Sequence, residues 1–192
     1  MDGDFSPYNS CGNGSAMRVG PVGWLSIKIP LLNEKLILNK AKESAECTHN
    51  HPEGIKGAQA TALCIYLARK GTPVGEIRRR IEKDFSYDLS MSVEELRPRY
   101  SWQGLDEAGN GGTCQGSVPQ AIICALEAKD FEDAVRNAIS IGGDSDTIGC
   151  ITGSIAEALY GIPNDIRQKG LSYLPNEFKK VIDEFEDKFG NK

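Results

Sequence analysis

The stretch GGDSDTIGCITGSIAEALYG, residues 142–161, carries the information that decides both the fold class and the candidate site. A glycine pair precedes two carboxylates, Asp144 and Asp146, and then Thr147, and an apolar run with helical spacing follows. Two interpretations of the acidic turn are open. Asp144 or Ser145 can cap the helix that begins here, or the carboxylates and the hydroxyl can bind a hard cation such as Mg²⁺, Ca²⁺ or Mn²⁺.

The helix after the turn favours the cation. Gly149, Gly153 and Ala156 form a stripe of small residues, which predicts close packing against another helix and places the acids near the interior. Buried carboxylates are costly unless they are paired or metal-bound. An EF-hand loop is excluded, because Ile148 and Ile155 occupy positions that need oxygen ligands.

Most of the remaining sequence also predicts helices, which glycine- and proline-marked turns separate, so we expect an all-α fold with a single domain over residues 1–192. Ser92 and Glu95 have the spacing of a capping box. One short apolar run, at 21–30, is compatible with a strand. The expected helices cover residues 36–47, 55–69, 74–83, 92–97, 118–128, 131–141, 146–160 and 176–189.

Composition restricts the class of partner and the compartment. The 22 basic and 27 acidic residues give a net charge of -5, which argues against nucleic-acid binding, and no apolar run is long enough to span a membrane. The start of the chain lacks the pattern of a signal peptide, and the six cysteines form no C-x-x-C pair. Cys64, Cys124 and Cys150 lie among apolar residues, as buried free thiols do. We therefore expect a cytoplasmic protein with reduced cysteines.

Three further features have both a functional and an ordinary interpretation. The Asn13-Gly14-Ser15 turn can present backbone N–H groups to an anion, or it is only a glycine-rich turn. His49 and His51 are the two histidines of the chain, and each serves either a site or a structural hydrogen bond. Cys114 has no identifiable base partner, so we interpret it as an ordinary thiol.

Taken together, four ordered stretches resemble the ADP-ribosylglycohydrolase family, of the dinitrogenase-reductase-activating type. They are GNGSAMRVGP at 12–21, THNHPEGIKGAQATA at 48–62, CQGSVPQAI at 114–122 and ISIGGDSDTIGCITGSIAEALYG at 139–161. The resemblance implies an orthogonal helical bundle with a binuclear Mg²⁺ or Mn²⁺ site. It also implies cleavage of the N- or O-glycosidic bond at the anomeric carbon of ADP-ribose.

The resemblance also assigns residues. Asp144, Asp146 and Thr147 match metal ligands of the family, and His49 matches a position that lines its cleft. The loop that holds ADP-ribose in the family corresponds to Asn13, Gly14, Ser15 and Met17. The partner implied is ADP-ribose or an ADP-ribosylated protein.

One departure from the family pattern bears on activity. The resemblance places a Thr-Asp-Asp-Thr-like motif and the general base in an N-terminal segment, and this sequence has no adjacent Asp-Asp pair. We therefore expect an N-terminally truncated bundle with half of the metal ligands, and no catalytic residue is assigned. Two functions stay open: a metal-dependent hydrolase that removes ADP-ribose, and a non-catalytic module that binds ADP-ribose, a nucleotide or a partner. Apolar surface left exposed would favour a homodimer.

Overall fold

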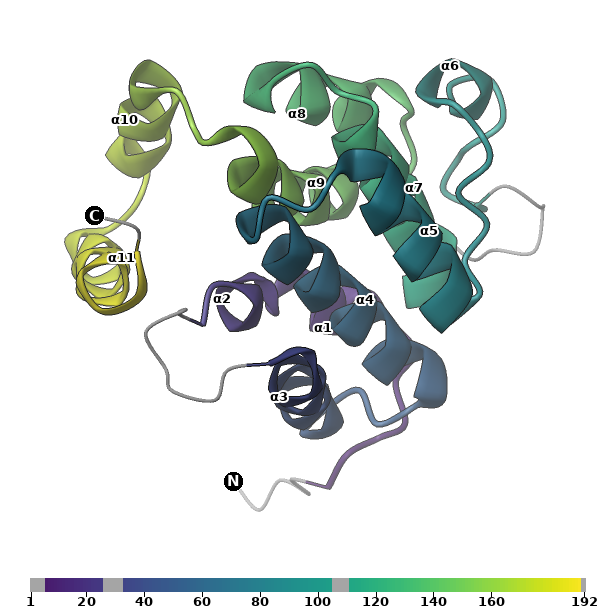
Figure 1. The fold of residues 1–192 in the computed structure, drawn as a ribbon, viewed down its shortest axis with the longest axis horizontal. Helices are drawn as coiled ribbons and strands as arrows, with labels where there is room; N and C mark the ends of the chain where they lie inside the picture. Colours follow the sequence, from purple (N-terminus) through teal and green to yellow (C-terminus); the bar gives the residue numbers. More distant parts are fainter. Residues whose placement is uncertain (1–5, 26–32, 105–110, 191–192) are drawn as a thin grey trace.

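The structure, a computed structural model, describes residues 6–25, 33–104 and 111–190. These ranges contain helices and isolated bridges but no longer strand, which confirms the all-α prediction (Figure 1). The helices are α1 (Gly14–Met17), α2 (Gly20–Gly23), α3 (Glu34–Glu46), α4 (Pro52–Arg69), α5 (Val74–Phe85), α6 (Val93–Leu96), α7 (Cys114–Leu126), α8 (Phe131–Ser140), α9 (Ser145–Tyr160), α10 (Asn164–Ser172) and α11 (Asn176–Phe189). Within the described ranges, none of them is long and apolar enough to cross a membrane.

Helix α4 lies at the centre of the bundle and is buried on nearly every side. Twelve of its 18 residues are buried, most of them alanine or another small or aliphatic residue, and neighbouring helices pack around it (Figure 1). Small side chains let those neighbours approach closely. At Gly57 an added Cβ would lie 2.5 Å from the Cys114 Sγ atom, so the contact between α4 and α7 requires a glycine.

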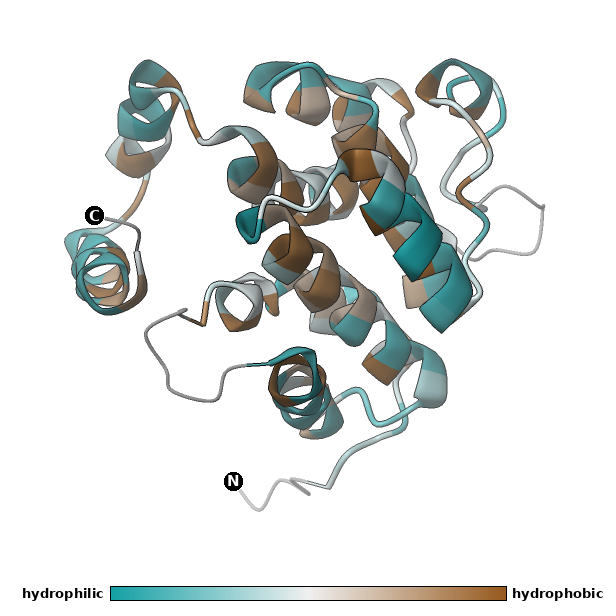
Figure 2. Ribbon diagram, viewed as in Figure 1, coloured by the Kyte–Doolittle hydropathy of each residue, from teal (hydrophilic) through white to brown (hydrophobic). Residues whose placement is uncertain are grey.

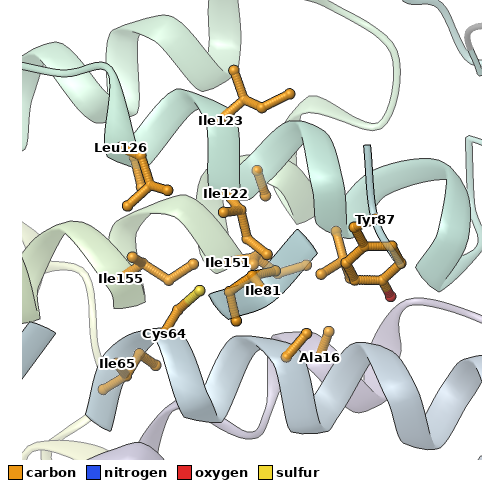
Figure 3. Close-up of a cluster of buried hydrophobic side chains, with 14 of the residues drawn as sticks. Ala16, Cys64, Ile65, Ile81, Tyr87, Ile122, Ile123, Leu126, Ile151 and Ile155 are labelled. Carbon is orange, nitrogen blue, oxygen red and sulfur yellow. The ribbon is translucent and has the colours of Figure 1, made fainter. Parts of the chain in front are cut away.

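Helices α7, α8 and α9 form the other half of the core. Twelve of the 13 residues of α7 are buried, and α9 packs against α7, α8 and α4. Figure 3 shows Cys64 of α4, Ile122 of α7 and Ile151 of α9 meeting in the apolar interior, where all three are fully buried. Burial of each isoleucine stabilises the fold by roughly 1.5–3 kcal/mol.

The predicted helices are present. Two of them begin earlier than predicted, because a capping side chain sets their first residue. The helix expected from residue 55 begins at Pro52, because the imidazole of His51 accepts a hydrogen bond from the first turn. The helix expected from residue 118 begins at Cys114, because Thr113 caps it in the same way. These first turns have no apolar periodicity in the sequence, because side-chain caps stabilise them.

Three helices were not predicted: α1, α2 and α10. The first two have four residues each, too few to show a helical period, and α10 has no buried residue. The strand suggested at 21–30 is wrong over its first residues, because α2 ends at Gly23. Its residues 26–30 lie outside the described ranges.

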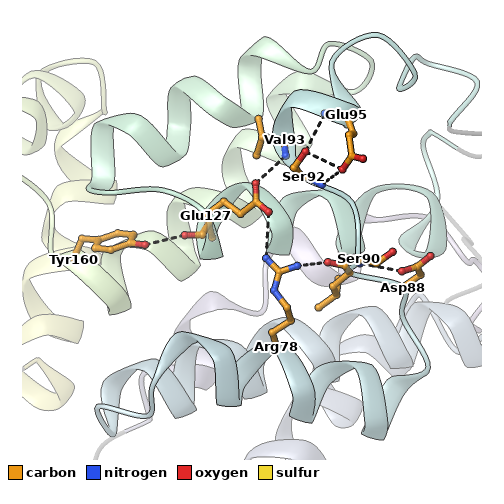
Figure 4. A network of polar contacts seen from close by, with 10 residues as sticks. Arg78, Asp88, Ser90, Ser92, Val93, Glu95, Glu127 and Tyr160 are labelled. Atoms are coloured by element: carbon orange, nitrogen blue, oxygen red, sulfur yellow. Dashed lines mark hydrogen bonds and ion pairs between the residues drawn. The ribbon is translucent and has the colours of Figure 1, made fainter.

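A polar network on one side of the bundle joins α5, α6 and α7 (Figure 4). The Glu127 carboxylate accepts a hydrogen bond from the Val93 backbone N–H at 2.9 Å and pairs with Arg78 at 3.4 Å. The predicted capping box is confirmed, because Ser92 and Glu95 exchange both of its hydrogen bonds. These contacts fix the short helix α6 against the core. The charged residues of α5 lie on its outer face (Figure 2).

The last two helices form an arm beside the core. No residue of α10 or α11 is buried, and Arg167 and Glu186 join the two helices through contacts of 2.6 and 2.7 Å. A groove with a volume of about 1050 Å³ separates the arm from α2 and α9. Its walls are largely apolar and include Trp24, Phe131 and Phe185.

Glu157 of α9 lines this groove, and burial raises the pKa of its carboxyl, with a further contribution from Glu186. A carboxyl with a raised pKa binds its proton more tightly in the folded protein than in the unfolded one. The protonated Glu157 therefore stabilises the fold at low pH, and this stabilisation is lost as pH rises from the unfolded pKa through the folded pKa. We expect Glu157→Gln to raise the free energy of unfolding at pH 7 and to have a smaller effect at pH 4. Urea denaturation at both pH values measures this. Equal effects at the two pH values would contradict the assignment, and Glu177→Gln on the exposed first turn of α11 is the control.

Candidate functional site

The glycine-rich turn before α1 and the segment 111–113 before α7 lie side by side and form the floor of the candidate site. Gly12 and Thr113 form an isolated antiparallel bridge, with the Asn13 N–H donating to the Gly112 carbonyl at 3.2 Å and the Cys114 N–H donating to the Cys11 carbonyl at 2.9 Å. This pairing fixes the turn before α1 against the start of α7. Residues about one hundred positions apart are therefore held in register by backbone hydrogen bonds.

Cys114 lies beneath these loops and is a structural thiol, as predicted. Its Sγ atom lies 3.2 Å from the Gly12 carbonyl and 3.4 Å from the Ser15 hydroxyl. Burial raises its pKa to about 11. A thiol with a raised pKa is protonated at neutral pH and is a poor nucleophile.

Asn13 connects the turn to the acidic stretch. Its side-chain amide donates to Asp144 Oδ2 at 2.6 Å and to the Ser117 hydroxyl at 3.2 Å. Ser117 donates in turn to the Thr113 carbonyl at 2.7 Å. Asn13 and Asp144 are 8% and 7% exposed, so this hydrogen bond is buried and stabilises a carboxylate that burial would otherwise penalise.

Asp144 is the N-cap residue of α9, but its side chain caps nothing. It accepts no hydrogen bond from a backbone N–H of the first turn, so the interpretation of this side chain as a helix cap is wrong. The preceding glycines explain its position. Gly142 and Gly143 have positive φ angles of 78° and 64°, and an added Cβ at Gly143 would overlap the Tyr100 ring. The turn therefore directs the Asp144 carboxylate inward.

Asp146 and Thr147 continue this cluster. The exposed Asp146 carboxylate accepts a hydrogen bond from the Thr147 N–H at 2.9 Å. Contact with the Asp144 carboxyl, followed by this backbone hydrogen bond, lowers the pKa of Asp146. The Thr147 hydroxyl is buried and donates to the Met17 Sδ atom at 3.5 Å. The structure thus brings together the three predicted metal ligands and two of the predicted ADP-ribose residues.

The donor set suits a hard cation in part. Two neighbouring carboxylates and a hydroxyl supply oxygen ligands, and neither carboxylate forms a salt bridge with a cationic side chain among the described residues. Within residues 6–25, 33–104 and 111–190, no group of three His, Cys, Asp or Glu side chains is arranged to hold a metal ion. Asp144, Asp146 and Thr147 therefore fit one side of a metal shell.

The predicted stripe of small residues on α9 is packed only in part. Gly153 faces open space whereas Ala156 is fully buried, so Gly149, Gly153 and Ala156 do not form one continuous packing face. The buried residues of α9 are Thr147, Ile148, Ile151, Thr152, Ile155 and Ala156. Cys150 lies on the exposed side of α9, so its predicted burial is also wrong, whereas Cys64 and Cys124 are buried. All six cysteines are free thiols, as expected.

The rest of the predicted ADP-ribose loop is placed by α1. Ser15 is fully buried, backbone included, and its hydroxyl donates to the Gly54 carbonyl at 2.7 Å, so its role in this structure is to hold the turn. Gly14 precedes it at the first position of α1, where helix geometry leaves the backbone N–H without an intrahelical acceptor. The part of this turn that can meet a ligand is therefore main chain.

His49 lies against the same turn. An added Cβ at Gly14 would be 3.3 Å from its Nε2 atom, and its Nδ1 atom lies 2.6 Å from the Thr48 hydroxyl. The side chain is 8% exposed, and burial together with Arg18 lowers its pKa. His51 is different, since its Nδ1 atom accepts the Glu53 N–H at 3.1 Å and caps α4. The structure therefore brings one of the two histidines to the candidate site.

Sequence reasoning missed three residues around the site. Ser117 accepts a hydrogen bond from Asn13 and orients it. Thr48 contacts His49 directly, and Arg18 acts on His49 through the Thr48 hydroxyl. Each lies within a stretch that resembles the family, but no local pattern shows which side chain it faces. The groove beside the arm is separate, since none of the predicted site residues lines it.

The sequence is similar to those of known proteins. The family description ADP-ribosylglycohydrolase matches residues 1–192. The chain belongs to the ADP-ribosylglycohydrolase family. It is similar to the ADP-ribosylhydrolase ARH3 of Danio rerio, with 30% identity over 82% of this chain and 52% of the relative. It is also similar to the ADP-ribosylarginine hydrolase Tri1 of Pseudomonas putida (strain GB-1), with 25% identity over 83% of this chain and 41% of the relative.

The fold of this ADP-ribosylglycohydrolase-family chain also matches a solved structure, an ADP-ribosylglycohydrolase-related protein complex, with a TM-score of 0.61. The match covers 95% of this chain and 59% of the other at 24% sequence identity, so it concerns the fold alone. The chain spans about half the length of ARH3 and less of Tri1.

The buried contact between Asn13 and Asp144 can be tested by exchanging the two side chains. We expect Asn13→Asp to destabilise the protein by about 2 kcal/mol or more, because two carboxylates then meet in a buried place. The double variant Asn13→Asp with Asp144→Asn restores a donor and an acceptor, so it should recover most of that loss. Urea denaturation of the wild type, both single variants and the double variant measures the coupling. Additive effects of the two substitutions would show that this hydrogen bond does not hold the site together.

Proposed function

We propose that this chain is a metal-dependent hydrolase that removes ADP-ribose from an ADP-ribosylated protein side chain or a small-molecule adduct. The observation that carries the proposal is the buried contact between Asn13 and Asp144, which joins the predicted ligand loop to the predicted metal ligands. Family membership supports the reaction class, and the names of ARH3 and Tri1 describe ADP-ribosyl hydrolases.

Asp144, Asp146 and Thr147 would hold Mg²⁺ or Mn²⁺. A divalent cation in such a place polarises bound oxygen atoms and lowers the pKa of a bound water. The chain's own part is to hold the ligands: Asn13 orients the Asp144 carboxylate, and the Thr147 N–H orients that of Asp146. Both orienting hydrogen bonds leave further carboxylate lone pairs for a cation.

The turn at Asn13, Gly14, Ser15 and Met17 would bind ADP-ribose mainly through main-chain groups. The Gly14 N–H group is the natural donor to an anionic diphosphate, since it has no intrahelical acceptor and Gly14 has no side chain to cover it. The Ser15 hydroxyl and the Met17 sulfur serve structure instead, through Gly54 and Thr147. His49 would lie beside the ligand at this turn.

A non-catalytic binding module is the second candidate function. The observation in its favour is the incomplete ligand set, because the described residues hold no cluster of three acidic, cysteine or histidine side chains for a metal. A single cation bound by Asp144, Asp146 and Thr147 would keep several waters. Binding of ADP-ribose without turnover distinguishes this function from hydrolysis.

Both functions are tested by measuring Mn²⁺ binding, ADP-ribose binding and release of ADP-ribose from a modified peptide with the purified chain. We expect Asp144→Asn to weaken Mn²⁺ binding at least tenfold, because it removes a charged ligand while it keeps an acceptor for Asn13. Asp165→Asn, on the exposed first turn of α10, is the matched control and should bind as the wild type does. Equal Mn²⁺ affinity of all three proteins would overturn the proposed metal site. Turnover supports the hydrolase, and binding without turnover supports the binding module.

The same proposal includes a homodimer that covers the arm. Phe178 and Val181 of α11 are 54% and 64% exposed, which leaves an apolar strip on a helix with no buried residue. A cytoplasmic location and the absence of nucleic-acid and membrane partners stay predictions from the sequence.

We expect the wild-type chain to sediment as a dimer at micromolar concentration and Val181→Glu to shift it toward monomer, because the new charge would be buried in the interface. Lys180→Glu changes the adjacent, exposed position by a larger charge difference and should leave the dimer intact. Sedimentation velocity over a concentration series measures both. A wild-type chain that is monomeric throughout the series would rule out the dimer.

A further inference from the structure

A short chain of hydrogen bonds leads from Arg18 to His49. The Arg18 guanidinium donates to the Thr48 hydroxyl at 2.7 Å and also to the Ser44 carbonyl at 2.8 Å, near the end of α3. The Thr48 hydroxyl lies 2.6 Å from His49 Nδ1. Arg18 follows α1 directly, so this chain connects the ligand loop to the histidine.

The direction of these hydrogen bonds follows from the chemistry of the groups. A guanidinium can only donate, so the Thr48 hydroxyl is an acceptor toward Arg18 and has its one proton to give to His49 Nδ1. In the opposite arrangement His49 Nδ1 donates to Thr48. The hydroxyl proton would then have no acceptor among the described residues, because the contacts of that hydroxyl are those to Arg18 and His49. The first arrangement gives the hydroxyl proton an acceptor.

A neutral imidazole that accepts at Nδ1 carries its proton on Nε2. Burial and the charge of Arg18 both lower the pKa of His49, which favours the neutral ring. Arg18 is the charged group that acts on the ring, and the Tyr8 ring packs beside it with centroids 6.3 Å apart.

The Nε2 edge of the ring faces the ligand loop. Added Cβ atoms at Gly12 and Gly14 would lie 3.5 and 3.3 Å from Nε2, so glycine at these positions keeps this edge uncovered. Within the described residues, the hydrogen bonds of His49 are its backbone N–H to Ala45 and the contact at Nδ1. Its Nε2–H is therefore available to a ligand.

We propose that Arg18 and Thr48 are positioning residues that fix His49 in the Nε2–H tautomer, so that the ring presents a hydrogen-bond donor beside Gly14 to an oxygen atom of ADP-ribose. The identity of the ligand rests on the proposed function, whereas the tautomer depends on this chain alone. The arrangement gives the turn a side-chain donor in addition to its main-chain N–H groups.

The tautomer is tested by NMR of the ¹⁵N-labelled chain, in which two histidines give the ring signals and a His51→Gln variant assigns them. We expect an unprotonated Nδ1 and a protonated Nε2 for His49 at pH 7. Thr48→Val removes the hydroxyl and should give a mixture of tautomers, whereas Thr48→Ser keeps the hydroxyl and should keep the single tautomer. A protonated Nδ1 in the wild type, or a Thr48→Val spectrum equal to the wild type, would overturn the proposal.

The role toward the ligand is tested by calorimetry with ADP-ribose on the same variants. We expect Thr48→Val and Gly14→Ala to bind ADP-ribose about threefold to tenfold more weakly than the wild type. Gly14→Ala covers His49 Nε2 without changing the tautomer. Thr48→Ser should bind ADP-ribose as the wild type does. If Thr48→Val and Gly14→Ala both bind ADP-ribose as tightly as the wild type, the donor role of His49 is refuted. No ADP-ribose binding by the wild type would refute the proposed function and the ligand role together, while the NMR result still decides the tautomer.

Discussion

A carboxylate in the interior of a protein has to be paired, and the Asn13 amide pairs Asp144. This one contact, 2.6 Å long, joins the turn before α1 to the start of α9. Ser117 of α7 holds the same amide from the other side. Three segments far apart in the sequence therefore meet at one polar point inside an apolar bundle, and the direction of the Asp144 carboxylate depends on all three.

Glycine makes this meeting point sterically feasible. Gly143 turns the chain so that Asp144 points inward, in a conformation and a space that a side chain would not fit. Gly57 lets α4 approach α7 beneath the paired loops, and Gly14 leaves the Nε2 edge of His49 uncovered. In each case the missing Cβ makes room for a polar or backbone group, which is why the glycine-rich stretches coincide with the site.

The core and the arm are stabilised differently. Helices α4 and α7 are buried almost all round, whereas α10 and α11 have no buried residue and face the core across an apolar groove. The candidate site belongs to the well-packed half of the chain, since α1, α4, α7 and α9 all pack into the core. The arm contributes none of the predicted site residues.

The sequence by itself determined the helical class and most helix positions, because periodic apolar spacing and polar turns are local properties, and its resemblance to the family predicted the site residues. Only the tertiary structure decided what each side chain contacts. Asp144 points to Asn13 instead of capping its own helix, Gly153 faces open space, and Thr48 connects Arg18 to His49. These contacts depend on how segments distant in the sequence pack together. No local pattern shows which distant residue a side chain will contact.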